Sequence, residues 1–200
     1  MTALPRLILA SGSERRRALL RQIGLEPDKI TVTDIDETPL YNEKPNKLVR
    51  RLAVDKLLAA SLDAADSFII AADTVVAVGR RILSKPANEI EARCYLQLMS
   101  GRRHRVHTAV AAYAPDGHQR VRIVNSVVAF KRLSEEEINW YLASGEWCGK
   151  AGGYAIQGCA GRFVRFLSGS YSNVVGLPLF ETVNLLEGLG YPVRGGRLDD

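Results

Sequence analysis

Short apolar runs alternate with helical periodicity in the first half of the chain. Leu7–Ala10 is an apolar run of strand length that ends at small residues, and Phe68–Ala72 is a second such run. Between them, apolar residues recur at steps of four, four and three, which is the spacing of one helix face. This stripe consists of Val49, Ala53, Leu57 and Ala60. The pattern predicts two buried strands with an amphipathic helix between them.

Capping signals predict two further helices. Ser11 and Glu14 have capping-box spacing, and Leu19, Leu20 and Ile23 follow as an apolar side before Gly24. Ser134 and Glu137 have the same spacing before a later apolar stretch. A Ser or Thr followed three residues later by Glu is typical of a helix N-terminus, and a glycine is typical of its end.

The second half adds a hairpin and two helical stripes. The pattern predicts strands at Ile30–Thr33, Val106–Tyr113 and Val121–Phe130. It predicts helices from the apolar stripes Ile90/Cys94/Leu98 and Leu179/Val183/Leu186. The segment Gly149–Gly176 is expected to be irregular. The turn Pro115–Gly117 joins the last two strands. Strands interleaved with helices predict a mixed α/β fold, and we expect one domain over residues 1–200.

Composition suits a globular protein of the cytoplasm. Hydrophobic residues make up 46% and charged residues 24% of the 200, and no apolar run approaches the roughly 18 residues of a membrane helix. Leu7–Ala10 is too short and too weakly flanked by positive charge for a signal peptide. Three cysteines, odd in number and without metal-ligand spacing, suit a reducing compartment. We therefore expect a cytoplasmic protein without a membrane partner.

The formal charge of +5 favours an anionic partner. The basic residues are scattered, however, and no run of five or six occurs. A solvated surface with a mild excess of arginine explains this charge equally well. Charge thus permits a phosphate-binding role without demonstrating one.

The segment Ser11–Arg17 is the first candidate site. A strand, a small-residue turn and a helix start place backbone N–H groups where an anion can bind, and Arg15, Arg16 and Arg17 add charge-assisted contacts. A capped helix with a solvated arginine face is an equal alternative. The lysine of a P-loop is missing, which excludes a Walker nucleotide site.

Carboxylates supply the second candidate. Asp73 with Thr74 follows a wholly apolar strand, and a carboxylate there is costly unless it is paired or metal-bound. A carboxylate that merely caps a turn is the alternative. The loop with Asp34, Asp36 and Glu37 suits Mg²⁺, because this ion is bound by such oxygens together with substrate phosphates. The alternative is an exposed acidic loop without a ligand.

Polar residues of the second half complete the candidates. Lys85 precedes Pro86, where the backbone is stiff, and could contact a phosphate. In Lys150–Gly158, glycines allow close backbone approach and Gln157 offers a donor and an acceptor for a base edge, although a glycine-rich surface loop is equally possible. His104 and His107 fall on opposite faces of one strand, which argues against a shared metal. Ser168 and Ser170 lack triad partners.

Taken together, these motifs resemble the Maf family of nucleoside triphosphate pyrophosphatases from end to end. The matching pieces are Ala10–Ser13 with Arg15-Arg16, Asp36-Glu37, Ala72–Val76, Lys85-Pro86, Ser100-Gly101 with His104, Val106 and Thr108, Lys150–Gly158, and Gly169–Tyr171 with Asn173–Pro178. The resemblance implies a two-lobed α/β fold, Maf/ITPase-like, with a curved mixed sheet flanked by helices and the active site in the central cleft. It also implies hydrolysis between the α- and β-phosphates, a divalent cation (Mg²⁺ or Mn²⁺) and a homodimer.

The resemblance also assigns roles to residues. Asp73 matches the family's proton acceptor, and Glu37 matches an acidic position that helps Asp73 to hold the metal. The positions matched to phosphate binding are Ser13, Arg15, Arg16, Lys85 and Lys150. Arg15, Thr74 and Gln157 match positions of substrate choice, and Ile156-Gln157-Gly158 looks like the branch that acts on dTTP and UTP. Many members have proline where this chain has Glu14; glutamate is favourable in a first helical turn but weakens phosphate binding slightly.

Two other functions stay open at this point. The chain could belong to the sister branch that prefers 7-methyl-GTP and related nucleotides. Its positive charge also allows a nucleic-acid-binding regulator without triphosphate turnover. The lack of a dense basic patch or an aromatic stacking repeat argues against the regulator, so no stable nucleic-acid partner is expected.

Overall fold

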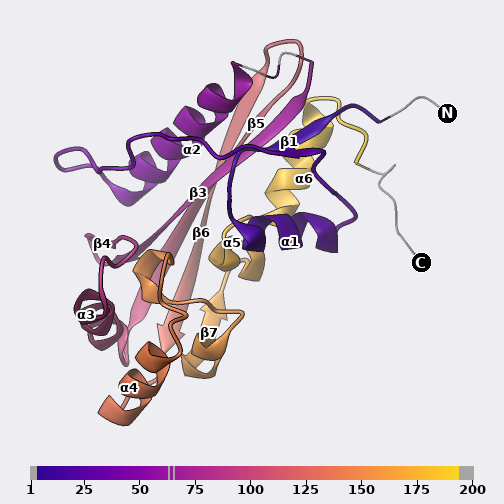
Figure 1. Cartoon of the computed structure of the whole chain (residues 1–200). Helices are drawn as coiled ribbons and strands as arrows, with labels where there is room; N and C mark the ends of the chain where they lie inside the picture. The colour runs from indigo at the N-terminus through magenta and orange to yellow at the C-terminus, as the bar shows by residue number, and fades with distance from the viewer. Residues whose placement is uncertain (1–3, 63, 65, 194–200) are drawn as a thin grey trace. The chain divides into compact units, whose positions relative to one another are not determined.

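A computed structural model describes residues 4–62, 64 and 66–193 (Figure 1). It contains a sheet of seven strands in the order β2-β1-β3-β5-β6-β7, with β4 paired to β3. The strands are β1 (Leu7–Leu9), β2 (Lys29–Ile30), β3 (Phe68–Val78), β4 (Arg81–Leu83), β5 (Arg103–Tyr113), β6 (Gln119–Phe130) and β7 (Val164–Ser168). Parallel pairs at β1 and antiparallel pairs at β4 and β7 make this a mixed sheet.

Helices are interspersed with the strands. They are α1 (Glu14–Gln22), α2 (Pro45–Ser61), α3 (Glu89–Met99), α4 (Glu135–Ala143), α5 (Tyr171–Val175) and α6 (Leu179–Gly188), with 3₁₀ turns η1 (Ala151–Gly153) and η2 (Cys159–Phe163). The predicted mixed α/β fold with a helix-flanked sheet is therefore confirmed. In the part of the chain that the structure describes, no helix has the length and apolar character needed to cross a bilayer.

The chain forms two compact units. Within the described residues, the first contains the chain up to Asp73, Thr108–Ile123 and the chain from Gly176 onward. The second contains Thr74–His107 and Val124–Val175. Strands β3, β5 and β6 each contribute residues to both units. The expectation of one domain over the whole chain stays a prediction.

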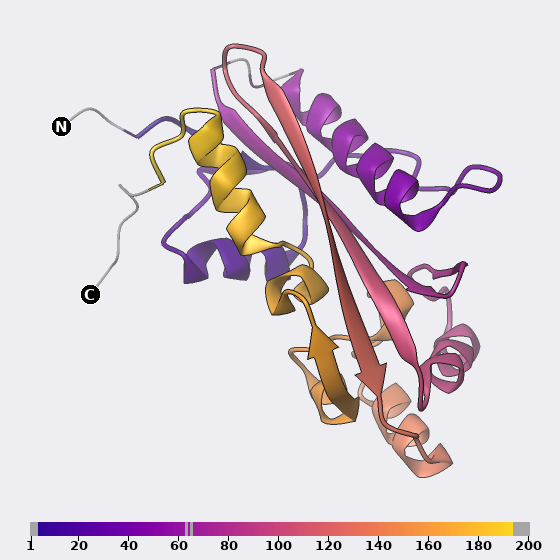
Figure 2. The same cartoon turned by 180° about the vertical axis from the view of Figure 1, so that it is seen from behind.

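The first unit is built around β1. This strand pairs in parallel with β2 and β3, so that Leu9 lies opposite both Ile30 and Ile70. In Figures 1 and 2, α2 lies on one face of these strands, and α1 and α6 lie on the other. Leu7, Leu9 and Ile70 are completely buried between these layers. The Ala10 amide donates to the Ile70 carbonyl over 2.8 Å, so the chain leaves β1 for α1 next to β3.

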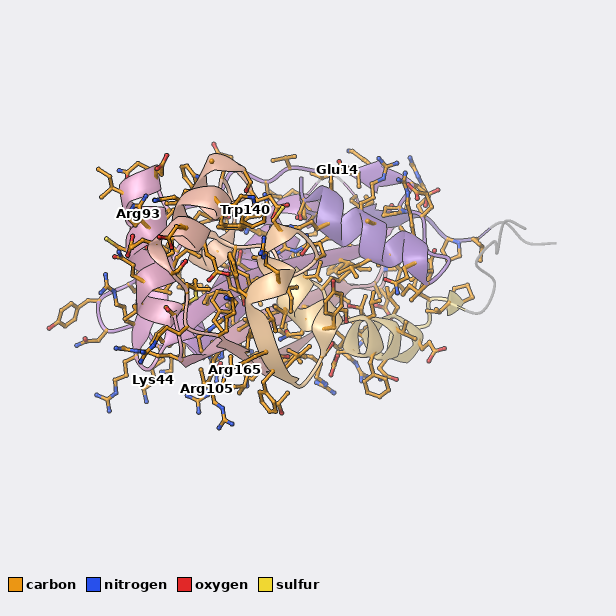
Figure 3. The ribbon with its side chains drawn as sticks, turned by 90° about the horizontal axis from the view of Figure 1, so that it is seen from below. Glu14, Lys44, Arg93, Arg105, Trp140 and Arg165 are labelled. Atoms are coloured by element: carbon orange, nitrogen blue, oxygen red, sulfur yellow. The ribbon has the colours of Figure 1, made fainter. Side chains whose placement is uncertain are left out.

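The second unit has an aromatic core. Phe130 packs edge-to-face against His104, Tyr154 and Phe163, with ring centroids 5.0 to 6.1 Å apart. Helix α3 contacts α4, and Arg93 on α3 (labelled in Figure 3) donates to Glu135 of α4 over 3.2 Å. Edge-to-face pairs of this kind add stability beyond the apolar area that they bury.

Two local predictions about β3 and α1 are wrong. Strand β3 does not end at Asp73 but continues to Val78, because the next residues, Val75–Ala77, are themselves buried. Helix α1 begins after Ser13, which is its N-cap without a side-chain cap. Ser11 is not the N-cap, because its hydroxyl accepts hydrogen bonds from the Ser13 amide and from Arg16 instead. The stop at Gly24, with φ +73°, is confirmed.

Two further predictions are corrected in the second half. The stripe Ile90/Cys94/Leu98 is not the buried face of α3, since Ile90 is 75% exposed. The buried residues are Ala92, Tyr95, Leu96 and Met99. The segment Gly149–Gly176 is not irregular throughout, because it contains η1, η2, β7 and α5. The capping box of Ser134 and Glu137 is confirmed.

The buried histidines make stability depend on pH. Burial lowers the pKa of His104 to about 4, and it also lowers the pKa of His107. The unfolded chain takes up these protons near pH 6.5, so the folded state loses stability as pH falls from there toward 4. We expect His104 to account for up to about 3 kcal/mol of this loss. Urea unfolding across this window measures it, and His104→Phe should flatten the dependence. A His104 ring that titrates near pH 6.5 by NMR would contradict this.

Candidate active site

The side chain of Asp73 is buried in the middle of β3. Asp73 is 7% exposed, and its Oδ1 accepts a hydrogen bond of 2.6 Å from Lys56 Nζ on α2. The same ammonium lies 2.6 Å from Glu37 Oε1. Lys56 is itself 7% exposed. Two carboxylates thus converge on one buried cation, and all three groups belong to the first unit.

Lys56 is the functional residue that the sequence analysis missed. It comes seven residues after Val49 and three after Ala53, so it lies on the apolar face of α2. Lysine is almost never fully buried unless it is paired. A lysine within the apolar stripe was therefore the signal that a buried carboxylate lies opposite.

Arg51 holds the loop with Glu37 against α2. Its guanidinium donates to the Glu43 carboxylate over 2.8 and 2.9 Å and to the Thr38 carbonyl over 3.0 Å. The hydrogen bond from Arg51 lowers the pKa of Glu43. Asp36 accepts from the Thr38 amide instead of joining Lys56. Glu37 is the residue of this acidic loop that forms an ion pair with Lys56, and its side chain is 40% exposed.

Arg16 adds a second cation to the cluster. Its Nε donates to the Gly176 carbonyl and its Nη1 to Ser11 Oγ, each over 2.9 Å. Burial lowers the pKa of the Arg16 guanidinium, whereas the charges of Asp73 and Glu37 raise it; an arginine stays charged under these conditions. Arg16 and Lys56 therefore balance the two carboxylates.

The start of α1 carries the other predicted phosphate ligands of this unit. Ser13 is the N-cap and Arg15 lies in the first turn, and both are half-buried. Glu14, which stands where many family members have proline, is exposed (Figure 3). A helix N-terminus attracts anions through its unpaired N–H groups and its dipole. The exposed Glu14 leaves this α1 start intact.

The second unit carries the remaining predicted residues. The Gly152 amide donates to the Ser84 carbonyl over 3.0 Å, which brings the segments with Lys85 and Lys150 side by side. A Cβ at Gly152 would lie 2.9 Å from Val76 Cβ, so η1 packs directly on β3. Thr74 lies on the same face of β3 as Val76. Lys85 and Gln157 are exposed, while Thr74 and Lys150 are half-buried.

The donors fit a cation that arrives with phosphate. In the described ranges, no group of three or more His, Cys, Asp or Glu side chains converges as a metal site. Glu37 and Asp73 supply two carboxylates around one cationic position. Mg²⁺ is usually bound by one or two carboxylates together with substrate phosphates and water. Such a pair therefore suits a metal–nucleotide complex better than a free ion.

Comparisons with known proteins give one consistent family. A model of the family described as "Maf-like protein" matches residues 6–189. The dTTP/UTP pyrophosphatase of Rhodopseudomonas palustris (strain HaA2) is 55% identical, over 100% of this chain and 99% of its own length. That of Caulobacter vibrioides is 54% identical, over 96% of this chain and 99% of its own length. That of Maricaulis maris is 59% identical, over 94% of this chain and 90% of its own length. This chain, with its buried Asp73 and intact α1 start, belongs to the Maf family.

Proposed function

We propose that this protein hydrolyses dTTP and UTP to the monophosphate and pyrophosphate. The observation that carries the proposal is the buried Asp73 carboxylate bound to Lys56 Nζ, beside the fixed guanidinium of Arg16. Relatives aligned over nearly their full length have the name dTTP/UTP pyrophosphatase. Such a site offers a base for a water molecule and positive charge for phosphate oxygens.

Asp73 is the general base of the proposed reaction. It accepts a proton from water while the water oxygen bonds to the α-phosphorus. The bond from the α-phosphorus to the bridging oxygen breaks, and pyrophosphate leaves with that electron pair. Lys56 holds Asp73 in one orientation through the 2.6 Å hydrogen bond. A positioned base of this kind contributes roughly 10² to 10⁴-fold to the rate.

Glu37 and Asp73 would hold the divalent cation, Mg²⁺ or Mn²⁺, together with phosphate oxygens. When bound, the cation stabilises negative charge on the phosphates as a Lewis acid. Lys56 occupies the position between the two carboxylates. It offsets the repulsion between them and so helps to hold Glu37 and its loop in place.

Phosphate binding falls to the cations and to the start of α1. The residues proposed to bind the phosphates are Ser13, Arg15, Arg16, Lys85 and Lys150. Because the charges of Arg16, Lys56, Glu37 and Asp73 cancel, the remaining cations have to supply the attraction for a triphosphate.

Gln157 and Thr74, together with Arg15, would select the nucleotide. The Gln157 amide has a donor and an acceptor for the base edge, and it is exposed to an incoming ligand. A site that hydrogen-bonds one base discriminates strongly against others, because their binding leaves polar groups unpaired.

The proposal also covers the oligomeric state, the partners and the cellular location of the protein. A homodimer without a stable nucleic-acid or membrane partner stays a prediction from the family resemblance. The cytoplasm is the proposed location, where the nucleotide substrate is available. All three cysteines are free thiols, in keeping with a reducing compartment.

Pyrophosphate release from a panel of nucleotides tests the function. With Mg²⁺ or Mn²⁺, we expect turnover of dTTP and UTP well above that of the purine triphosphates, and none with chelator. A preference for 7-methyl-GTP would assign the chain to the sister branch instead. Folded protein that hydrolyses no nucleotide but binds DNA or RNA in a salt-sensitive way would be the regulator.

Asp73→Asn tests the base. The variant keeps the shape of the side chain but cannot accept the proton, so kcat should fall by roughly 10² to 10⁴-fold. Circular dichroism and thermal melting serve as the control for folding. Near-normal turnover by a folded variant would exclude Asp73 as the base.

Lys56→Met tests the cation between the carboxylates. Removing one partner of a buried ion pair leaves the others uncompensated, so the free energy of unfolding should drop by about 3 kcal/mol. Mg²⁺ should then raise the melting temperature of the variant more than that of the wild type, because the freed carboxylates bind it. Lys47→Met, on an exposed position of the same helix, is the matched control. Equal melting behaviour of the two variants would contradict this role.

A further inference from the structure

The carboxylate of Glu146 is bound to the backbone two residues after Gln157. Its Oε2 and Oε1 accept the Cys159 amide over 2.8 and 3.0 Å. Glu146 lies in the turn after α4, where its own amide donates to Ser144 Oγ over 3.3 Å. Trp147 Nε1 donates to the Leu142 carbonyl over 3.1 Å and ties this turn to the end of α4. A hydrogen bond to an ionised carboxylate is roughly twice as strong as a neutral one.

Gly158 makes room for this carboxylate. A Cβ at Gly158 would lie 2.5 Å from both Glu146 oxygens. The φ of Gly158 is −110°, which any residue can adopt. Gly158 therefore leaves the space that the Glu146 carboxylate occupies.

A second anchor holds the chain before Gln157. Tyr154 is buried, and its Oη shares a hydrogen bond of 2.9 Å with His104 Nε2 on β5. Ala155 and Ile156 are buried as well. The Gly158 amide donates to the Ala155 carbonyl over 3.1 Å and closes a turn. Gln157 is therefore an exposed side chain on a turn that is fixed on both sides.

We propose that Glu146 is a positioning residue for substrate selection, which clamps the Cys159 backbone and thereby fixes the direction of the Gln157 amide. This inference rests on the proposed role of Gln157 in reading the base. A recognition group on a turn that is already fixed loses little entropy on binding. It also penalises a wrong base more heavily, because the turn cannot move to re-pair its polar atoms.

Kinetics of three variants test the clamp. Glu146→Ala should reduce the ratio of kcat/KM for dTTP to kcat/KM for dGTP by about tenfold or more, mainly through KM for dTTP. Gly158→Ala should reproduce this effect, because its methyl group displaces the flexible carboxylate. Glu146→Gln should recover part of the ratio, since one oxygen still accepts the Cys159 amide. Glu89→Gln, an exposed carboxylate at the start of α3, is the control and should leave the ratio unchanged.

The Cys159 thiol gives a readout that does not depend on activity. A hydrogen bond with Glu146 is the main cause that raises the pKa of this thiol. Iodoacetamide should therefore alkylate Cys159 faster in Glu146→Ala and Gly158→Ala than in wild type at about pH 8. Peptide mass spectrometry resolves the sites, with the exposed Cys94 and Cys148 as internal references.

The two readouts separate the possible failures. Faster alkylation together with a reduced dTTP ratio supports the proposal. Unchanged alkylation in both variants means that the clamp does not exist. Faster alkylation with an unchanged dTTP ratio means that the clamp does not position Gln157. Either result overturns this inference and leaves the proposed function untouched. A wild-type protein that hydrolyses neither dTTP nor UTP overturns the proposed function, and the inference with it.

Discussion

The first unit depends on a lysine ammonium that is buried between two carboxylates. Lys56 lies on the apolar face of α2, where an unpaired charge would cost several kcal/mol, and its partners Asp73 and Glu37 come from a strand and a loop on either side of it in the sequence. The same cation makes a carboxylate tolerable in the middle of the buried strand β3. It also explains why the Glu37 loop lies against α2, where Arg51 binds Glu43. One ion-paired centre thus links α2, β3 and the loop with Glu37.

Charge balance limits what this centre can attract. Arg16 and Lys56 offset Glu37 and Asp73, so the cluster presents no net charge to a triphosphate. A carboxylate that accepts a proton from water has to lie near phosphates that repel it, and the repulsion has to be offset by other cations. In the proposed reaction the divalent ion arrives with the nucleotide, while Arg15, Lys85 and Lys150 supply the rest. A pair of carboxylates suits a metal that is bound together with substrate phosphates and water.

Much of the fold could be predicted from periodicity, while contacts between elements could not. The stripe from Val49 to Ala60 identified α2, and the capping box identified α4. The buried face of α3 was assigned wrongly because Ile90 is apolar yet exposed, and the choice of face depends on α4 and η1, which pack against the helix. Strand β3 was ended too early, because a polar residue inside an apolar run looks like a boundary unless its partner is known. The partner of Asp73 is Lys56, and the only sign of this pairing in the sequence is that Lys56 lies within the apolar stripe of α2.

The residues proposed for catalysis and those proposed for base selection are held by separate sets of contacts, which bears on specificity. Asp73, Lys56 and Glu37 belong to one unit, whereas Gln157 and its anchors belong to the other. If Gln157 reads the base, changes in the turn between Tyr154 and Cys159 alter nucleotide choice without disturbing the buried ion pair. Such changes are constrained nevertheless, since Gly158 has to leave room for Glu146 and Tyr154 has to reach His104. A branch with a different base preference would therefore need to alter these anchors together with Gln157, and not Gln157 alone.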